Sequence, residues 1–341
     1  MSTKKTQQSI DERQRLVDVA LGKAPADLVI TNGTLLNVFT GELLPQTGIA
    51  VAGKRIALVG DIKHCLGKNT AIIDADGKHL VPGFIDSHYH MESSLLSPCR
   101  HAELTIAHGT TSIFEDTHEI ANVLGIKGIK YFLKEAGRLP QKIYLSISSA
   151  TPPTNFETTG AYIDYNSARG LADEPMVAGI GEIVDFRRLY NHDTRLWGMI
   201  QLGLENELLI EGHSSTAPPE LDAYISAGVG STHSPRNPNE AWEMLRRGAQ
   251  IQLQMDRSEE IVKYLLLKKT PWHLVGLAID DRPVHIFLEK GGLDYEILKA
   301  IEEGVDVITA YQMATINNAL HWKMTRDIGS ISPGRLADIV L

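Results

Sequence analysis

Residues 81–92 read Val-Pro-Gly-Phe-Ile-Asp-Ser-His-Tyr-His-Met-Glu. The apolar run 81–85, entered through a Pro-Gly pair, is typical of a short buried strand. His88 and His90 follow at its C-terminal end, and side chains alternate between the two faces of a strand, so both imidazoles should point the same way. Such a pair is either half of a metal site or simply two polar residues at a strand end. The rest of the sequence has to decide between these readings.

From residue 81 onward, short apolar runs alternate with stretches of helical periodicity. We predict eight strands, each followed by helical or helix-permitting sequence, at 81–85, 109–114, 142–148, 176–183, 207–213, 229–233, 249–254 and 274–280. Two further helices, at 294–303 and 305–320, close the series. Eight βα units in about 240 residues predict a TIM (β/α)8 barrel. An open doubly wound sheet is the alternative, but its first strand would lack the expected Gly-rich phosphate loop.

The predicted barrel domain, at residues 81–325, has other segments on both sides. Residues 1–24 read as a lead-in with a weak helical pattern. Residues 25–80 read as short strands of a small β-sandwich domain, and the Asn-Gly pair at 32–33 predicts a hairpin turn. Residues 326–341 read as a turn and an apolar strand that returns to this domain. Because the chain stops on Ile-Val-Leu, we expect the C-terminal part of the small domain to be missing, as in a fragment or a shortened homologue.

The composition of the 341-residue chain excludes several classes of protein. It is 43% hydrophobic and 22% charged, as in soluble globular proteins, and no run reaches the roughly 18 apolar residues of a membrane span. The N-terminus lacks the apolar core of a signal peptide, and there are only two cysteines, so we expect a reducing, cytoplasmic location. The net charge of −9 argues against nucleic acid as a partner.

The ends of the predicted strands carry imidazoles and carboxylates. In a TIM barrel the chemistry takes place at these C-terminal ends, where we find His88, His90, Glu115, Asp116, His118, Glu182, His213, His233, Asp280 and Asp281. Such side chains are the ligands of paired divalent first-row metals. We expect Glu182 to be shared by two metals, and a water between them to become a hydroxide near neutral pH. Asp280 could bind one metal and accept the proton of that water.

Each histidine alone has a plainer explanation. His213 and His233 lie in polar segments where solvent-exposed histidines are common. Glu182 lies in an apolar, Gly-flanked strand, where burial of a carboxylate is costly unless it is paired or bound to metal. Six such residues at five strand ends together favour a metal site over chance, namely His88, His90, Glu182, His213, His233 and Asp280.

This set, together with the motif Pro-Gly-Phe-Ile-Asp-Ser-His-Tyr-His at 82–90, resembles the amidohydrolase superfamily. Three flanking segments narrow the resemblance to the adenine deaminase family. These segments are His-Met-Glu-Ser-Ser-Leu-Leu-Ser-Pro at 90–98, His-Glu-Ile-Ala-Asn-Val-Leu-Gly at 118–125 and Asp-Asp-Arg at 280–282. The resemblance extends from about residue 20 to the end of the chain. The block at 118–125 is specific to that family, whereas His-x-His occurs across the superfamily.

The resemblance implies a binuclear site of Mn(2+) or Fe(2+), with Zn(2+) as a further candidate, held by the six residues. It implies hydrolysis of adenine to hypoxanthine and ammonia, in which a metal-bridging hydroxide attacks C6 and Asp280 relays its proton to the leaving amine. His118 and Glu119 become candidate catalytic residues beside Asp280 and Glu182. The candidate contacts to the base are Glu92, Asp281 and Arg282. The resemblance also implies a small-molecule purine as the substrate, and it favours a homo-oligomer.

The sequence departs from the family at three loops. Asp-Pro-His-Glu is replaced by Asp-Thr-His-Glu at 116–119, and Asp-His-Glu by Thr-His-Ser at 232–234. Asp-Asp-Arg-His-Pro becomes Asp-Asp-Arg-Pro-Val-His at 280–285, and the family also extends well beyond this C-terminus. Two alternatives therefore stay open. One is an amidohydrolase that acts on another cyclic amidine or amide, and the other is a catalytically silent truncated homologue.

Overall fold

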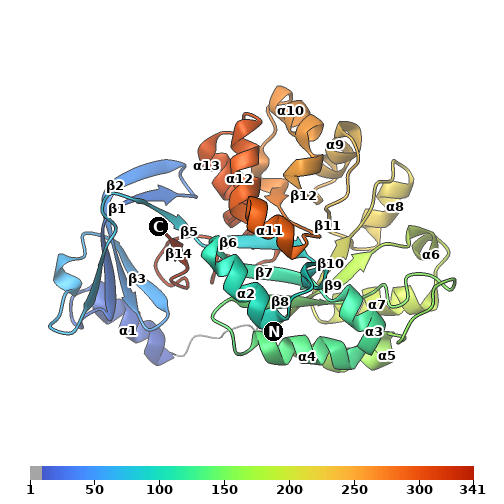
Figure 1. Ribbon diagram of the computed structural model, residues 1–341, viewed down its shortest axis with the longest axis horizontal. Helices are drawn as coiled ribbons and strands as arrows, with labels where there is room; N and C mark the ends of the chain where they lie inside the picture. The colour runs from blue at the N-terminus through green and yellow to red at the C-terminus, as the bar shows by residue number, and fades with distance from the viewer. Residues whose placement is uncertain (1–9) are drawn as a thin grey trace. The chain divides into compact units, whose positions relative to one another are not determined.

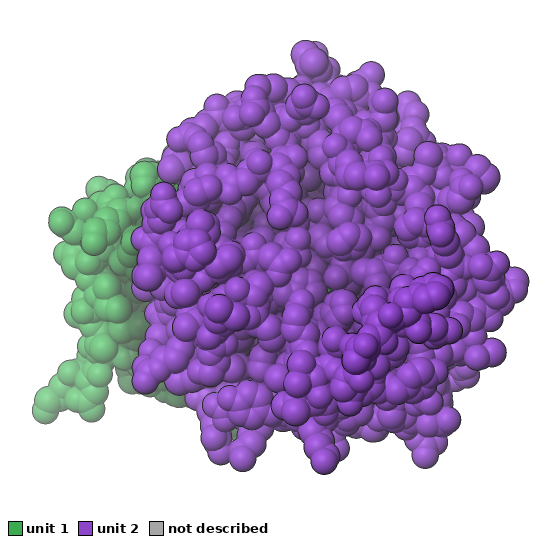
Figure 2. Space-filling model, turned by 45° about the vertical axis from the view of Figure 1, so that its right-hand side comes forward, with its two compact units in different colours: residues 1–84, 307–341 green, residues 85–306 purple. Residues whose placement is uncertain are grey.

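The computed structural model describes residues 10–341, and these form two compact units. One unit comprises residues up to 84 together with 307–341, and the other comprises residues 85–306 (Figure 2). The first nine residues of the predicted lead-in lie outside the described part. Its weak helical pattern is confirmed by α1 (Ile10–Ala20). Between residues 10 and 341, no helix combines the length and the apolar character needed to cross a membrane.

The unit at residues 85–306 contains the barrel strands. Each of the eight predicted strands has a counterpart, and Figure 1 shows the helices of this unit around them. The strands are β6 (Phe84–Tyr89), β7 (Thr110–Asp116), β8 (Lys142–Ile147), β9 (Val177–Ile183), β10 (Leu209–Gly212), β11 (Ser231–Thr232), β12 (Gln250–Leu253) and β13 (Val275–Leu277). Their apolar residues, such as Ile180 on β9 and Ile251 on β12, are fully buried.

Two sheets make up the wall of this barrel. Five strands pair in the order β10-β9-β8-β7-β6 and three in the order β11-β12-β13. Isolated parallel bridges connect the sheets on both sides, from Tyr89 to Asp280 and from Ile210 to Val229. The ring of eight strands is thereby closed, which is the TIM-barrel arrangement expected from the sequence.

Helices follow most of these strands, in agreement with the predicted alternation. They are α2 (Pro98–Ala107), α3 (His118–Leu124), α4 (Ile126–Ala136), α5 (Tyr165–Ala168), α6 (Phe186–Tyr190), α7 (Thr194–Glu205), α8 (Glu220–Ser226), α9 (Pro238–Arg246), α10 (Glu259–Leu267), α11 (Val284–Lys290) and α12 (Leu293–Glu302). The apolar spacing over residues 120–136 predicts a single helix, and this prediction is wrong. The chain breaks between α3 and α4 at Gly125, whose φ of 60° lies outside the helical region.

The other unit contains a six-stranded sheet. Its strands are β1 (Leu28–Asn37), β2 (Glu42–Ala52), β3 (Arg55–Gly60), β4 (Ala71–Asp74), β5 (His79–Pro82) and β14 (Ile339–Val340). They pair in the order β14-β5-β1-β2-β3, with β4 also on β1. Helix α1 contributes Leu16 and Val19 to the core on one face of the sheet. The second layer of a β-sandwich and the domain boundaries at 24, 80 and 325 remain predictions.

Two local predictions in this unit are wrong. Asn32-Gly33 is not a hairpin turn, because β1 continues through it with an irregularity and Asn32 has a φ of 56°. Glycine is required for close approach instead, since a Cβ at Gly33 would lie 2.4 Å from the side chain of Leu80. The helix expected at 305–320 is two helices, α13 (Val307–Met313) and α14 (Ile316–His321), because the backbone of Thr315 leaves helical geometry.

Candidate metal centre

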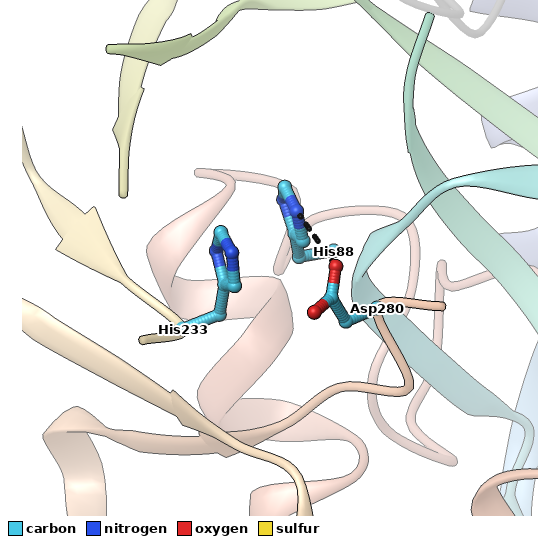
Figure 3. Close-up of side chains that lie close together, drawn as sticks. All are labelled: His88, His233 and Asp280. Atoms are coloured by element: carbon cyan, nitrogen blue, oxygen red, sulfur yellow. Dashed lines mark ion pairs between the residues drawn. The ribbon is translucent and has the colours of Figure 1, made fainter. Parts of the chain in front are cut away.

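The six predicted ligands lie together at the C-terminal end of the barrel. Their nitrogen and oxygen atoms form three overlapping groups, each within 4.8 Å: His88, His233 and Asp280; His88, His90 and Glu182; Glu182, His213 and His233. Figure 3 shows the first of these groups, in which side chains from three different strands face one another. Strands far apart in the sequence therefore supply one cluster, as the strand-end argument predicts.

Glu182 occupies the middle of the cluster and uses its two oxygens differently. Oε1 lies 3.4 Å from Nε2 of His90. Oε2 lies 2.8 Å from Nδ1 of His213 and 3.4 Å from Nε2 of His233. Oε1 therefore faces the histidine that follows β6, and Oε2 faces the histidines that follow β10 and β11. This is the geometry of a carboxylate that can be shared by two cations.

The four histidines fit the ligand role in spacing, and two of them, His88 and His233, also fit it in protonation. Nε2 of His88 and Nε2 of His90 are 3.2 Å apart, and Nδ1 of His213 and Nε2 of His233 are 3.0 Å apart. Two nitrogens on one tetrahedral metal, with bonds of about 2.0–2.1 Å, would be about 3.3 Å apart. Burial lowers the pKa of His233 to about 3, and burial with nearby His233 and His90 lowers the pKa of His88. Neutral imidazole is the form that binds metals. Hydrogen bonds to Glu119 and Glu182 raise the pKa of His90 despite its burial, and the hydrogen bond to Glu182 raises the pKa of His213, so metal binding would release protons from these two rings.

Asp280 is held in a fixed and strained conformation beside these histidines. Its Oδ1 lies 3.7 Å from Nε2 of both His88 and His90, and its Oδ2 accepts a hydrogen bond of 2.8 Å from Nε2 of Gln254. The backbone φ of Asp280 is 61°, in the left-handed region that non-glycine residues rarely adopt. Burial raises the pKa of Asp280 to about 6. One carboxylate oxygen is thus anchored and the other faces the cluster.

Two further carboxylates form hydrogen bonds that hold predicted ligands in position. Oε2 of Glu119, a predicted catalytic residue, lies 3.2 Å from Nδ1 of His90, where it can orient the ring and leave Nε2 for a metal. Oδ2 of Asp116 accepts the backbone N–H of Glu182 at 2.6 Å. Only glycine fits at position 181, because a Cβ there would lie 2.6 Å from the Asp116 carboxylate.

Glu119→Ala is expected to weaken divalent-metal binding by roughly 10- to 100-fold, because His90 loses the acceptor that fixes its ring. Titration of the metal-free protein with Mn(2+) measures this change. Glu103→Ala is the matched control, since Glu103 is an exposed carboxylate on α2 paired with Arg100. Equal affinity of the Glu119 variant and the control would contradict the supporting role.

Three other predicted residues lie near the cluster in different roles. The ring centroid of His118 is 6.3 Å from that of His90. Oε1 of Glu92 accepts the backbone N–H of Ile120, so this carboxylate helps to hold the start of α3. Asp281 is exposed, unlike its neighbour Asp280.

Arg282 points away from the cluster. Its guanidinium forms a buried ion pair with Glu296 of α12 and donates to the backbone oxygens of Gly291 and Gly292. This placement argues against the predicted contact with the substrate, because the donors of the side chain already have partners inside the protein. The sequence could not indicate this pairing, since nothing in the helical pattern distinguishes Glu296 from the other charged residues of α12.

Arg282→Met is expected to destabilise the protein by about 3–5 kcal/mol, because Glu296 would remain buried without its partner. Denaturant unfolding measures the loss. The double variant Arg282→Met/Glu296→Leu should recover most of it, since an apolar pair leaves no buried charge. A double variant as unstable as the single one would argue against this explanation.

Gln254 is absent from the predicted site, and Asp116 is among the predicted strand-end acids without a role of its own. Gln254 contacts Asp280, and Asp116 contacts the backbone of Glu182. Both lie at the ends of predicted strands, which is the signal that could have identified them. A search for metal ligands passes over Gln254, because an amide is not a typical metal ligand.

The sequence matches a known family and several curated proteins. Residues 79–218 and 276–341 match the model of the amidohydrolase family. The chain is 37% identical over 334 residues to an adenine deaminase of Clostridium botulinum, which covers 95% of this chain and 55% of that protein. It is 39% identical over 344 residues to an adenine deaminase of Staphylothermus marinus, covering 97% and 57%. The chain thus spans about half the length of these relatives.

Solved structures share the fold at low sequence identity. A beta-aspartyl dipeptidase from Fervidobacterium islandicum AW-1 superposes with a TM-score of 0.66 and 16% identity, covering 92% of this chain and 90% of that one. An adenosine deaminase from Xanthomonas campestris with bound Zn gives a TM-score of 0.61 at 15% identity, covering 93% and 84%. At this level of identity the likeness concerns the fold alone.

Proposed function

The chain belongs to the amidohydrolase family, and from this we propose that it is a metal-dependent hydrolase of C–N bonds that converts adenine to hypoxanthine and ammonia. The observation that carries the proposal is the placement of the two Glu182 oxygens, which face separate sets of imidazoles. The 37–39% identity to curated adenine deaminases supports adenine as the substrate.

The donor set suits a pair of Mn(2+) or Fe(2+) ions, and Zn(2+) is also compatible with it. His88 and His90 with Oε1 of Glu182 would hold one ion, and His213 and His233 with Oε2 would hold the other. Asp280 would contribute to the same centre. When bound, such a pair supplies Lewis acidity that makes water a nucleophile at neutral pH.

Asp280 is the residue that we assign to proton transfer. In the reaction a C–O bond forms at C6 of adenine, the C–N bond breaks, and the amine must leave with an added proton. Asp280 would take a proton from the attacking water and return it to the leaving amine. Gln254 fixes Oδ2 of Asp280, so Oδ1 remains directed at the cluster where these steps would occur.

A different cyclic amidine or amide is the second candidate substrate, because Ser214, Thr232 and Ser234, beside His213 and His233, have hydroxyl side chains. Thr232 donates to the backbone oxygen of Ser214 at 3.0 Å and lies 3.2 Å from the hydroxyl of Ser234. Both hydroxyls flank His233, at positions where the adenine deaminase family has acids. Thr232 is fully buried, whereas Ser234 is partly exposed, so a neutral Ser234 beside the cluster would select different polar groups on the substrate.

Metal analysis combined with ammonia release tests both candidates. Two divalent ions per chain with turnover of adenine in a purine panel would support the deaminase. Two ions with turnover only of another cyclic amidine or amide would support the second candidate. Less than one tightly bound ion per chain would contradict both and favour a catalytically silent homologue.

A further inference from the structure

Arg257 is an exposed cation beside the cluster. It is the last residue of the 3₁₀ turn η4 (Met255–Arg257), which follows β12 and Gln254 at the C-terminal end of the barrel. Nη1 of Arg257 lies 4.0 Å from Oδ2 of Asp280, beyond hydrogen-bonding distance. The side chain of Arg257 is 72% exposed, whereas that of Asp280 is 10% exposed. The guanidinium therefore lies on the solvent side of Asp280 without being its hydrogen-bond partner.

Two contacts to α12 hold the turn that carries this cation. The backbone N–H of Met255 donates to Oε2 of Glu296 at 2.6 Å. The hydroxyl of Tyr295 donates to Oδ1 of Asp256 at 2.7 Å. The backbone that carries Arg257 is thus fixed, while its guanidinium remains open to a molecule outside the chain.

Neither the fold nor the metals account for a cation at this position. Nε2 of Gln254 already donates to Oδ2 of Asp280 at 2.8 Å. An exposed charge 4.0 Å from this carboxylate adds little stability. A guanidinium is also repelled by divalent cations, so it gives no direct support to metal binding. The partner that remains is the molecule that binds at the cluster.

Asp280 determines where such a molecule places its amine. In the proposed reaction, Oδ1 of Asp280 faces the cluster and returns a proton to the amine that leaves C6. The guanidinium of Arg257 lies beside the other oxygen of the same carboxylate. A purine that presents its amine to Oδ1 therefore brings neighbouring ring atoms within a few ångströms of Arg257. The ring nitrogens that flank the amine, N1 and N7, both accept hydrogen bonds in adenine.

Only one of these nitrogens suits a guanidinium throughout the reaction. N1 becomes an N–H group when adenine is converted to hypoxanthine, whereas N7 of the 9H tautomer is an acceptor in both molecules. A guanidinium has donors only and does not give up its protons. Its hydrogen bond to N1 would be lost during turnover, and its hydrogen bond to N7 would be retained.

We propose that Arg257 binds the substrate by donating a hydrogen bond to N7 of the purine. This inference rests on the proposed function and adds a specificity-determining contact to it. N7 is an acceptor in the ground state and in the transition state alike, so the contact should act on KM more than on kcat.

Adenine and 7-deazaadenine, in which a C–H group replaces N7, test the contact in the unmodified chain and in Arg257→Ala. We expect kcat/KM for adenine to fall by roughly tenfold or more in the variant, the effect of losing a hydrogen bond from a charged donor. The value for 7-deazaadenine should stay within about twofold, because this base has no acceptor to lose. The two bases differ in reactivity, but this difference is common to both proteins and cancels in the comparison.

Arg138→Ala is the matched control. Arg138 is 64% exposed, lies in the turn before β8 of the same unit, and pairs with Glu135. This variant should change neither kcat/KM nor the ratio between the two bases. Arg257→Ala should keep the metal content and the melting temperature of the unmodified chain, because the side chain is exposed. Arg257→Met, which retains the apolar part of the side chain, should give the same result if the alanine variant does not fold.

Titration calorimetry with hypoxanthine and 7-deazahypoxanthine measures the same contact without turnover, since hypoxanthine keeps N7. The Kd for hypoxanthine should rise by roughly tenfold or more in Arg257→Ala, and the Kd for 7-deazahypoxanthine should not change. Equal losses for a base and its 7-deaza analogue would overturn the proposal, because Arg257 would then act through its charge or through Asp280.

Three outcomes separate this inference from the proposed function. Adenine turnover by the unmodified chain with no loss in Arg257→Ala would overturn the inference and leave the deaminase proposal intact. A chain that binds hypoxanthine but does not release ammonia from adenine would overturn the deaminase proposal and leave the calorimetric test decisive. A chain that neither releases ammonia from adenine nor binds hypoxanthine would overturn both.

Discussion

Glu182→Gln is expected to reduce the bound metal to one ion per chain at most and to lower the rate of adenine deamination by roughly 10³-fold, the upper range for loss of one electrostatic group from a catalytic site. The reason is geometric, since the two oxygens of Glu182 face separate imidazole sets. An amide offers one neutral oxygen and cannot serve both. Metal analysis of the purified variant and an ammonia assay measure the two effects.

Glu174→Gln is the matched control, because Glu174 is an exposed carboxylate in the turn before β9, the strand that carries Glu182. We expect this variant to keep both the metal content and the rate. Two ions and near-normal turnover in Glu182→Gln would show that the carboxylate is not shared between metals.

Asp280→Asn is expected to lower kcat by roughly 10²- to 10⁴-fold, the contribution typical of general acid–base catalysis. The amide can still accept the hydrogen bond from Gln254 but cannot take up a proton. Metal content should fall less than in Glu182→Gln, because Asp280 lies at the edge of the cluster, with Oδ1 3.7 Å from the nearest nitrogens. Steady-state kinetics with metal analysis of the same sample separate the two quantities.

An exposed carboxylate of the same unit provides the control for this variant. Glu289→Gln changes a side chain on α11 that takes no part in the cluster and should leave kcat within a few-fold of the unmodified chain. Should Asp280→Asn lose metal and activity in the same proportion, Asp280 would act as a ligand and not as a proton carrier.

Local patterns were sufficient to predict the barrel and the cluster. Hydrophobic runs alternating with helical periodicity fixed eight strands, and β9 and β12 were found within two residues of their predicted limits. The strand ends of a barrel converge on one rim, so the sequence alone predicts that residues as distant as His88 and Asp280 lie in one cluster.

Long-range partners could not be read from the sequence. Arg282 follows Asp280 in a motif that suggested a site residue, yet its charge is satisfied by Glu296, fourteen positions later on the buried side of α12. Asn32-Gly33 has the composition of a hairpin turn, but the side chain of Leu80 packs against Gly33 and the strand continues. In both cases the decisive contact comes from a segment that local periodicity does not connect to the motif.

The closure of the barrel by two isolated bridges has a consequence for its motions. Those bridges are the seams between the five-stranded and three-stranded sheets, and predicted metal ligands lie on both sides of each seam. His88 and His90 face Asp280 across one seam, and His213 faces His233 across the other. Cations bound there would tie the two sheets together where backbone pairing is sparsest. The N–H groups of His90, Asp280 and Gly230 donate the hydrogen bonds of these bridges. Their amide hydrogen exchange should therefore slow on metal loading more than exchange in the middle of the five-stranded sheet.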